Sequence, residues 1–261
     1  MDKHPIVHVG GDMESALNGK YTINIQSILK EAWALTLLSR KTINISLFFI
    51  LMFGVFITLL TSNFLGGIEK VQQDPEASFL INIIITLVIS PLIAGVEMFG
   101  VFASVGIKSQ PRMLFSFLKS ASYVSLCALC SMVLISIGLE LFVLPGVYLV
   151  IALTLTMPLI IEKKLSPLKS ILISLKVTRF QWPQIFLLHF ILATVFFVSL
   201  LPLLFLINSP ASIIGVAIFF FSMSYLAPMY YHMKGILYRE IFGLDIQTVD
   251  KQTTINSTFS A

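Results

Sequence analysis

Long apolar runs separated by short polar segments dominate the chain. A helix needs about 20 apolar residues to cross the roughly 30 Å hydrocarbon core of a bilayer. Six runs are close to that length: Ile43–Leu65, Phe79–Ile107, Ala121–Leu144, Val147–Ile161, Gln184–Ile207 and Ala211–Tyr231. Outer-membrane barrels would instead show runs of about ten alternating residues, which the chain lacks. The pattern predicts an all-α polytopic membrane protein with six transmembrane helices arranged as three hairpins.

The composition supports this prediction. Of the 261 residues, 57% are apolar and 11% are charged, whereas soluble domains carry roughly 45–50% apolar and about 25% charged residues. Low charge and high apolar content also argue against a disordered chain. With only two cysteines, a fold built on disulfides is excluded.

The basic residues indicate an orientation. If both termini lie in the cytoplasm, 16 of the 17 lysines and arginines fall inside and only Lys70, in the external loop Gly66–Ser78, falls outside. This is the distribution expected from the positive-inside rule. We therefore expect a cytoplasmic tail and an amphipathic interfacial helix over residues 1–41, a transmembrane domain over residues 42–232 and a cytoplasmic tail over residues 233–261.

Each predicted hairpin follows an amphipathic segment. These segments are Tyr21–Lys41, Pro111–Lys119 and Ser166–Trp182, and their mixed apolar and basic faces favour the membrane interface. The three units would be parallel repeats, because every hairpin begins and ends inside, in contrast to the inverted repeats of many transporters.

Basic residues near these segments are candidates for contact with lipid head groups. A lysine or arginine near an anionic membrane surface contributes about 1 kcal/mol to binding. Nucleic acid is not an expected partner, because the charges are spread along membrane borders. The candidate head-group contacts are Lys30, Arg40, Lys41, Arg112, Lys163, Lys164, Lys169, Lys176 and Arg179.

One stretch of the chain resembles known families. The matching residues are Leu144-Pro145-Gly146-Val147-Tyr148-Leu149, Pro158 to Lys164, Ser166 to Ser170, and Trp182. Over residues 144–186 the chain resembles the YciC-like proteins and the membrane domain of glycerophosphodiester phosphodiesterases. The resemblance implies a multi-pass fold in the bacterial inner membrane. It implies no catalytic residue, because the phosphodiesterase activity of those proteins belongs to a separate soluble domain.

Three ionisable residues lie in the apolar runs. Glu97 is eleven residues from Lys108 and His189 is ten from Arg179, which places both about 15 Å deep along their helices. The two side chains could form a proton relay, hold a polar group of a substrate, or simply fix the packing of two helices. Glu140 is expected about 31 Å from Lys119, near the outer interface.

The chain shows no sequence signature of an enzyme or a metal site. Cys127 and Cys130 form a Cys-x-x-Cys on an apolar helix, where burial opposes thiolates, so both are expected to pack. Phosphate loops, zinc-binding helices and nucleophile elbows are absent from the sequence. We expect no cofactor, no metal and no catalysis.

Three hypotheses on function follow. The first is a non-enzymatic membrane protein of envelope or membrane maintenance that contacts lipid. The second is a transporter or channel for a small solute or lipid that uses Glu97 and His189. It predicts a polar cavity in mid-membrane, and a dry interior around Glu97 would count against it. The third is a membrane subunit of another protein, and a homo-oligomer is compatible with each of these hypotheses.

Overall fold

The computed structural model describes residues 6–247, and helices account for 83% of them. Six helical segments of this range are long and apolar enough to cross a membrane. The all-α class and the number of long apolar helical segments are therefore confirmed, whereas the three-hairpin topology and the cytoplasmic termini stay predictions. The segments are α2 (Ile25–Phe64), α4 (Pro75–Ser104), η1 (Pro111–Ser120) with α5 (Ala121–Leu141), α6 (Val143–Ala152) with α7 (Thr156–Glu162), α8 (Pro167–Thr178), η2 (Arg179–Gln181) and α9 (Trp182–Leu206), and α10 (Ser212–Phe242).

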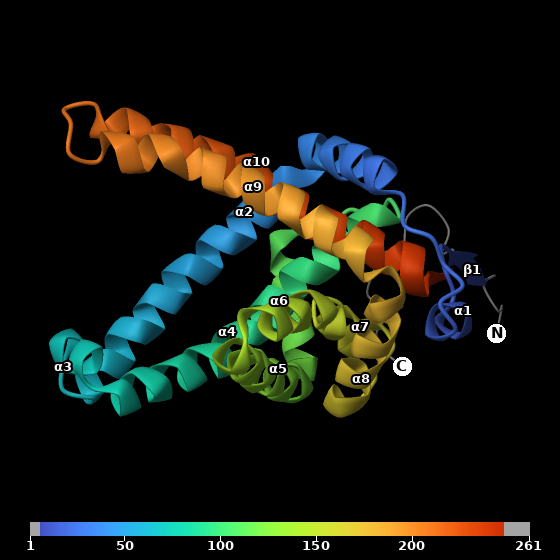
Figure 1. Ribbon diagram of the computed structural model, residues 1–261, viewed down its shortest axis with the longest axis horizontal. Helices are drawn as coiled ribbons and strands as arrows, with labels where there is room; N and C mark the ends of the chain where they lie inside the picture. Colours follow the sequence, from blue (N-terminus) through green and yellow to red (C-terminus); the bar gives the residue numbers. More distant parts are fainter. Residues whose placement is uncertain (1–5, 248–261) are drawn as a thin grey trace.

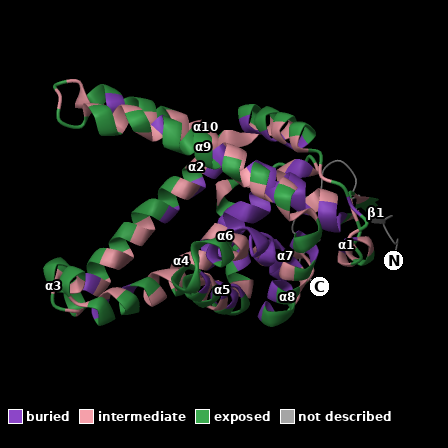
Figure 2. Ribbon diagram, viewed as in Figure 1, coloured by how far each residue is buried: buried purple, intermediate pink, exposed green. Residues whose placement is uncertain are grey.

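Two helical arms diverge from a common region (Figure 1). We call this region the base; in it, residues 91–104 of α4 pack against residues 228–242 of α10. The first arm consists of α2, the short helix α3 (Ile68–Gln73) and α4, and the second is the hairpin of α9 and α10. Helices α5 to α8 pack beside the base of the first arm. Buried residues concentrate in this base, where α4 and α10 meet, and the arms are mostly exposed along their length (Figure 2).

The helix boundaries differ from the sequence prediction in three places. The expected interfacial segment before residue 43 and the first span form one continuous helix, α2. This helix changes direction along its length (Figure 1). Thr36 and Ser39 donate to the carbonyls of Ala32 and Leu35, one turn earlier, and such bonds favour bending.

The fourth span is interrupted between Ala152 and Thr156. The third and fourth predicted spans are separated at residues 145–146, whereas α5 and α6 are separated at Phe142, whose backbone is extended. Pro145 lies in the first turn of α6, where a missing N–H costs no helical hydrogen bond.

The last helix is longer than predicted. Helix α10 continues to Phe242 and buries Lys234 and the residues around it. The boundary predicted after residue 232 therefore falls inside a continuous helix, and the cytoplasmic position of residues 233–242 stays a prediction. The last part of the predicted C-terminal tail, residues 248–261, lies outside the described residues, as do residues 1–5 of the predicted N-terminal tail.

A small sheet joins the two ends of the described chain. Strand β1 (Ile6–Val9) pairs antiparallel with β2 (Leu244–Gln247), directly after α10. Asp12 caps the following helix α1 (Met13–Leu17) by accepting from the backbone N–H of Ser15. The two ends of the described chain therefore lie side by side.

Candidate functional site

A buried ion pair joins α4 to α10. The Lys234 Nζ donates a hydrogen bond to Glu97 Oε1 at 2.6 Å. Glu97 is 7% exposed and Lys234 is 5% exposed. The second carboxylate oxygen of Glu97 is buried without a hydrogen-bond partner. Because a charge in such surroundings is costly unless it is paired, each residue makes the burial of the other tolerable.

Glycines allow the two helices to approach at this point. A Cβ at Gly235 would overlap the backbone of Gly100, and a Cβ at Gly100 would overlap the carbonyl of Tyr231. Small residues let the backbones of membrane helices come into contact. Gly100 is one turn from Glu97 and Gly235 follows Lys234. The close contact of α4 with α10 at these glycines therefore also brings Glu97 and Lys234 together.

The partner of Glu97 differs from the one considered from the sequence. No hydrogen bond joins Glu97 to His189, and both lie within the described residues. Sequence reasoning missed Lys234 because it placed this residue in a cytoplasmic tail. The apolar stretch Gly235-Ile236-Leu237-Tyr238 that follows was the available signal that the helix continues.

His189 lies close to the ion pair but bonds elsewhere. Its Nδ1 is 2.8 Å from the carbonyl of Ile185 and its Nε2 is 3.4 Å from the hydroxyl of Thr154. Since a carbonyl only accepts, Nδ1 carries the proton and Nε2 accepts. The ring meets Tyr230 edge to face at 5.9 Å, and the Lys234 ammonium lies 5.6 Å from the centre of the same Tyr230 ring. Tyr230 therefore connects His189 to the ion pair.

The interruption between α6 and α7 faces hydroxyl groups of α8. The hydroxyl of Ser174 donates to the carbonyl of Ala152 at 2.5 Å, and that of Thr178 lies 3.4 Å from the same oxygen. Together with Ser170, these residues form a fully buried stripe, one residue per turn. Ser174 and Thr178 thereby face a carbonyl that the end of α6 leaves free, whereas the hydroxyl of Ser170 has no hydrogen-bond partner.

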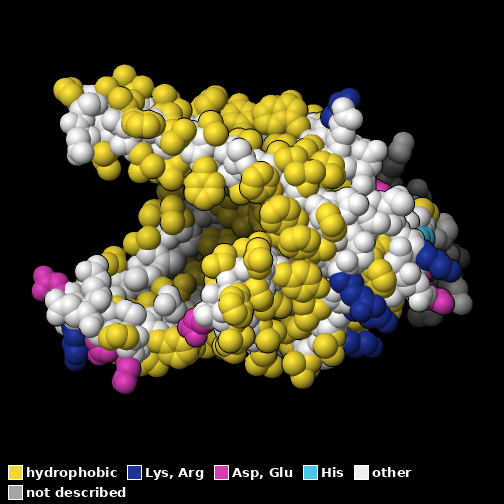
Figure 3. All heavy atoms as spheres, viewed as in Figure 1, with side chains coloured by type: hydrophobic (Ala, Val, Ile, Leu, Met, Phe, Trp, Pro, Cys, Tyr) yellow, Lys and Arg dark blue, Asp and Glu magenta, His cyan; other side chains and the backbone are white. Residues whose placement is uncertain are grey.

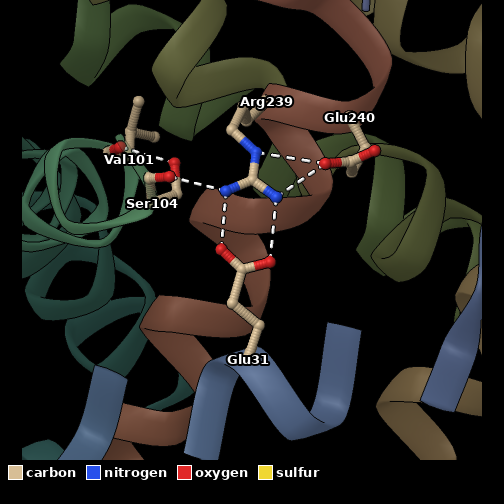
Figure 4. Close-up of polar contacts among 5 residues, drawn as sticks. All are labelled: Glu31, Val101, Ser104, Arg239 and Glu240. Carbon is tan, nitrogen blue, oxygen red and sulfur yellow. Dashed lines mark hydrogen bonds and ion pairs between the residues drawn. The ribbon is translucent and has the colours of Figure 1, made fainter. Parts of the chain in front are cut away.

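Arg239 connects three helices at the base (Figure 4). Its guanidinium binds both carboxylate oxygens of Glu31 at 2.6 and 2.9 Å, the carbonyl of Ser104 at 2.6 Å and Glu240 at 2.6 Å. A planar guanidinium suits this bidentate contact. The bond to Ser104 also places a cation at the C-terminal end of α4, which the helix dipole favours. The hydroxyl of Tyr238, the residue before Arg239 in α10, donates to Glu162 at 2.7 Å.

The other sequence-predicted residues lie on the surface or pack. Glu140 is exposed near the end of α5. Cys127 is buried and Cys130 is half-buried, and both are free thiols. Within residues 6–247, no three His, Cys, Asp or Glu side chains lie close enough together to hold a metal ion.

Most of the predicted head-group contacts are exposed. The two half-buried members both have partners. Arg40 stacks over the ring of Tyr225 at 3.8 Å, and Lys163 pairs with Glu162 at 3.2 Å. The exposed members are Lys30, Lys41, Arg112, Lys164, Lys169, Lys176 and Arg179. Most of the basic side chains visible in Figure 3 lie at the base, opposite the ends of the arms.

These contacts hold the helices of the base together. Glu97 and Lys234 are paired with each other, Arg239 is paired with Glu31 and Glu240, and the hydroxyls of Ser174 and Thr178 face a backbone carbonyl. The chain matches no protein-family model, no curated protein and no solved structure. The resemblance to the YciC-like proteins therefore stays a prediction.

Proposed function

We propose that the protein is a non-enzymatic, lipid-contacting membrane protein of envelope or membrane maintenance. We place it in the bacterial inner membrane with both termini in the cytoplasm, as the distribution of basic residues predicts. In this arrangement the base and its lysines lie at the inner surface. The two arms extend toward the outer surface.

The hollow between the two arms carries this proposal. Hydrophobic side chains cover both arms and surround the hollow (Figure 3). Large apolar residues are exposed on each arm. In the most apolar 18-residue stretch of α10, only 11% is buried inside the protein. Apolar surface of this extent needs an apolar solvent or partner. Acyl chains of bilayer lipids fit this requirement, and the exposed lysines at the base complement anionic head groups.

Native mass spectrometry with lipid identification tests the proposal. Protein released from membrane fragments should appear as one chain with several retained phospholipids. Replacing Lys163, Lys164 and Lys169 by Gln should lower the share of anionic lipid among them. A bare monomer without lipid, or a chain held in a stable complex with a companion protein, would contradict the proposal.

A transport path along Glu97 and His189 is the second candidate function. The interrupted helix α6–α7 beside His189 favours it, because transporters often place broken helices at their binding sites. The dry ion pair of Glu97 argues against it. Solute uptake into vesicles that contain the protein, abolished by His189→Gln with the fold intact, would move the assignment to transport.

A further inference from the structure

A cavity of about 350 Å³ lies at the base between α2, the end of α4 and α10. This volume is within the roughly 300–1,000 Å³ of typical ligand pockets. The lining comes from one stretch of α2, from α4 and the loop after it, and from one residue of α10. Its polar members are Ser39, Lys41, Thr42, Lys108, Ser109 and His232, and Glu97 and His189 are not among the lining residues.

Hydrogen bonds hold the polar side chains of the cavity in place, but two of their atoms have no hydrogen-bond partner. His232 is 1% exposed, and its Nε2 lies 3.1 Å from the hydroxyl of Ser39. Thr42 donates to the carbonyl of Ser109 at 3.2 Å, which fixes the loop after α4 against α2. Two buried atoms here have no hydrogen-bond partner, the hydroxyl oxygen of Ser109 and Nδ1 of His232. Buried polar groups normally have partners, so unsatisfied groups indicate a missing one.

The cavity carries positive charge without a counterion. Lys41 and Lys108 both line it, and its lining contains no acidic residue. Neither lysine forms an ion pair with an Asp or Glu of residues 6–247. Two ammonium groups and a free hydroxyl can all donate hydrogen bonds to a negatively charged acceptor. A phosphate group matches this set, because its oxygens accept several charge-assisted hydrogen bonds.

The remaining wall of the cavity is apolar. It includes Leu35, Leu38 and Phe99. Leu38 is 84% exposed on α2, a helix that is apolar enough to span a membrane. A phosphate that continues into acyl chains would satisfy both sides of the cavity, whereas free phosphate would leave the apolar wall uncovered.

We propose that this cavity binds the phosphate of an anionic phospholipid between Lys41 and Lys108. The proposal deepens the proposed function and rests on it. Lys108 is not among the head-group contacts predicted from the sequence, because only the fold brings it next to Lys41. The other basic residues contact the membrane surface, whereas these two hold one lipid at a defined position.

Titration of phosphatidylglycerol into the full-length protein in detergent, followed by native mass spectrometry, tests the proposal. Lys41→Gln/Lys108→Gln should raise the dissociation constant about 30-fold, which corresponds to roughly 2 kcal/mol for two head-group lysines. The control Lys20→Gln/Lys119→Gln removes the same charge from exposed positions outside the cavity. It should bind like the unchanged protein. An equal loss in both variants would overturn the proposal.

Two further experiments test whether the lipid occupies the cavity and whether the phosphate belongs to a lipid. Ala103→Leu fills the cavity without changing charge and should also weaken binding of phosphatidylglycerol, whereas unchanged binding would place the lipid elsewhere. Inorganic phosphate should bind far more weakly than phosphatidylglycerol, and equal affinity would overturn the lipid assignment. If lipids are retained but neither lysine matters, the cavity proposal fails and the proposed function stands. If the unchanged protein retains no lipid at all, the proposed function fails.

Discussion

Removal of one partner of the Glu97–Lys234 pair should destabilise the protein strongly. The substitution Glu97→Gln keeps the size of the side chain but leaves the ammonium of Lys234 unpaired at 5% exposure. Breaking a buried pair in this way typically costs about 3–5 kcal/mol. Because folded proteins are stable by only about 5–15 kcal/mol, a loss of this size takes a large share of the total.

The double substitution Glu97→Met/Lys234→Met should recover most of this loss. It removes both charges and fills their place with apolar side chains, a change that is often neutral or stabilising. As a control, Glu140→Gln alters an exposed carboxylate and should change the free energy of unfolding by less than about 0.5 kcal/mol.

Unfolding in mixed detergent micelles, followed by circular dichroism, measures these free energies. The expected order of stability places the double variant near the unchanged protein and Glu97→Gln well below both. If Glu97→Gln lies within about 1 kcal/mol of the unchanged protein, the pair is not buried as described. If the double variant is as unstable as the single one, the cost does not come from an uncompensated charge.

Three further predictions concern the base and the ends of the chain. Gly235→Ala should cost about 1–3 kcal/mol by overpacking, while Gly54→Ala, whose Cβ meets only ordinary contact with Ile89, should not destabilise; the same unfolding assay checks both. Arg239→Lys should cost about 1–3 kcal/mol in that assay, because an ammonium cannot reproduce the bidentate contact. The hydrogen bond to Asp245 raises the pKa of His8, so the β1–β2 pairing should be fully stabilised by this bond below pH about 6.5 and lose that stabilisation as the pH rises through the folded-state pKa. Hydrogen exchange of β1 measures this effect, and a His8→Gln variant that keeps the same pH dependence would contradict it.

The sequence predicted the helical class and the number of spans because both depend on local hydropathy alone. Ile43–Leu65 and Gln184–Ile207 fall in α2 and α9, and each runs only one residue past the end of its helix. The sixth helix continues past the predicted end at Tyr231, because a single lysine was taken as a membrane border. Lys234 is instead tolerated inside the base, since Glu97 of a distant helix neutralises it.

The polar sites depended on long-range contacts that no local pattern records. Glu97 was identified from its depth in an apolar run, but its partner lies 137 residues away. The cavity likewise joins Lys41, which precedes the first predicted span, to Lys108, which follows the second. The β1–β2 pairing was missed because two strands of four residues each leave no detectable periodicity.

A structure of the protein in lipid nanodiscs tests the central claim most directly. We predict density for acyl chains in the hollow between the arms, with α2 and α4 still diverging from α9 and α10. Closed arms without lipid, or a second protein chain in the hollow, would contradict the account.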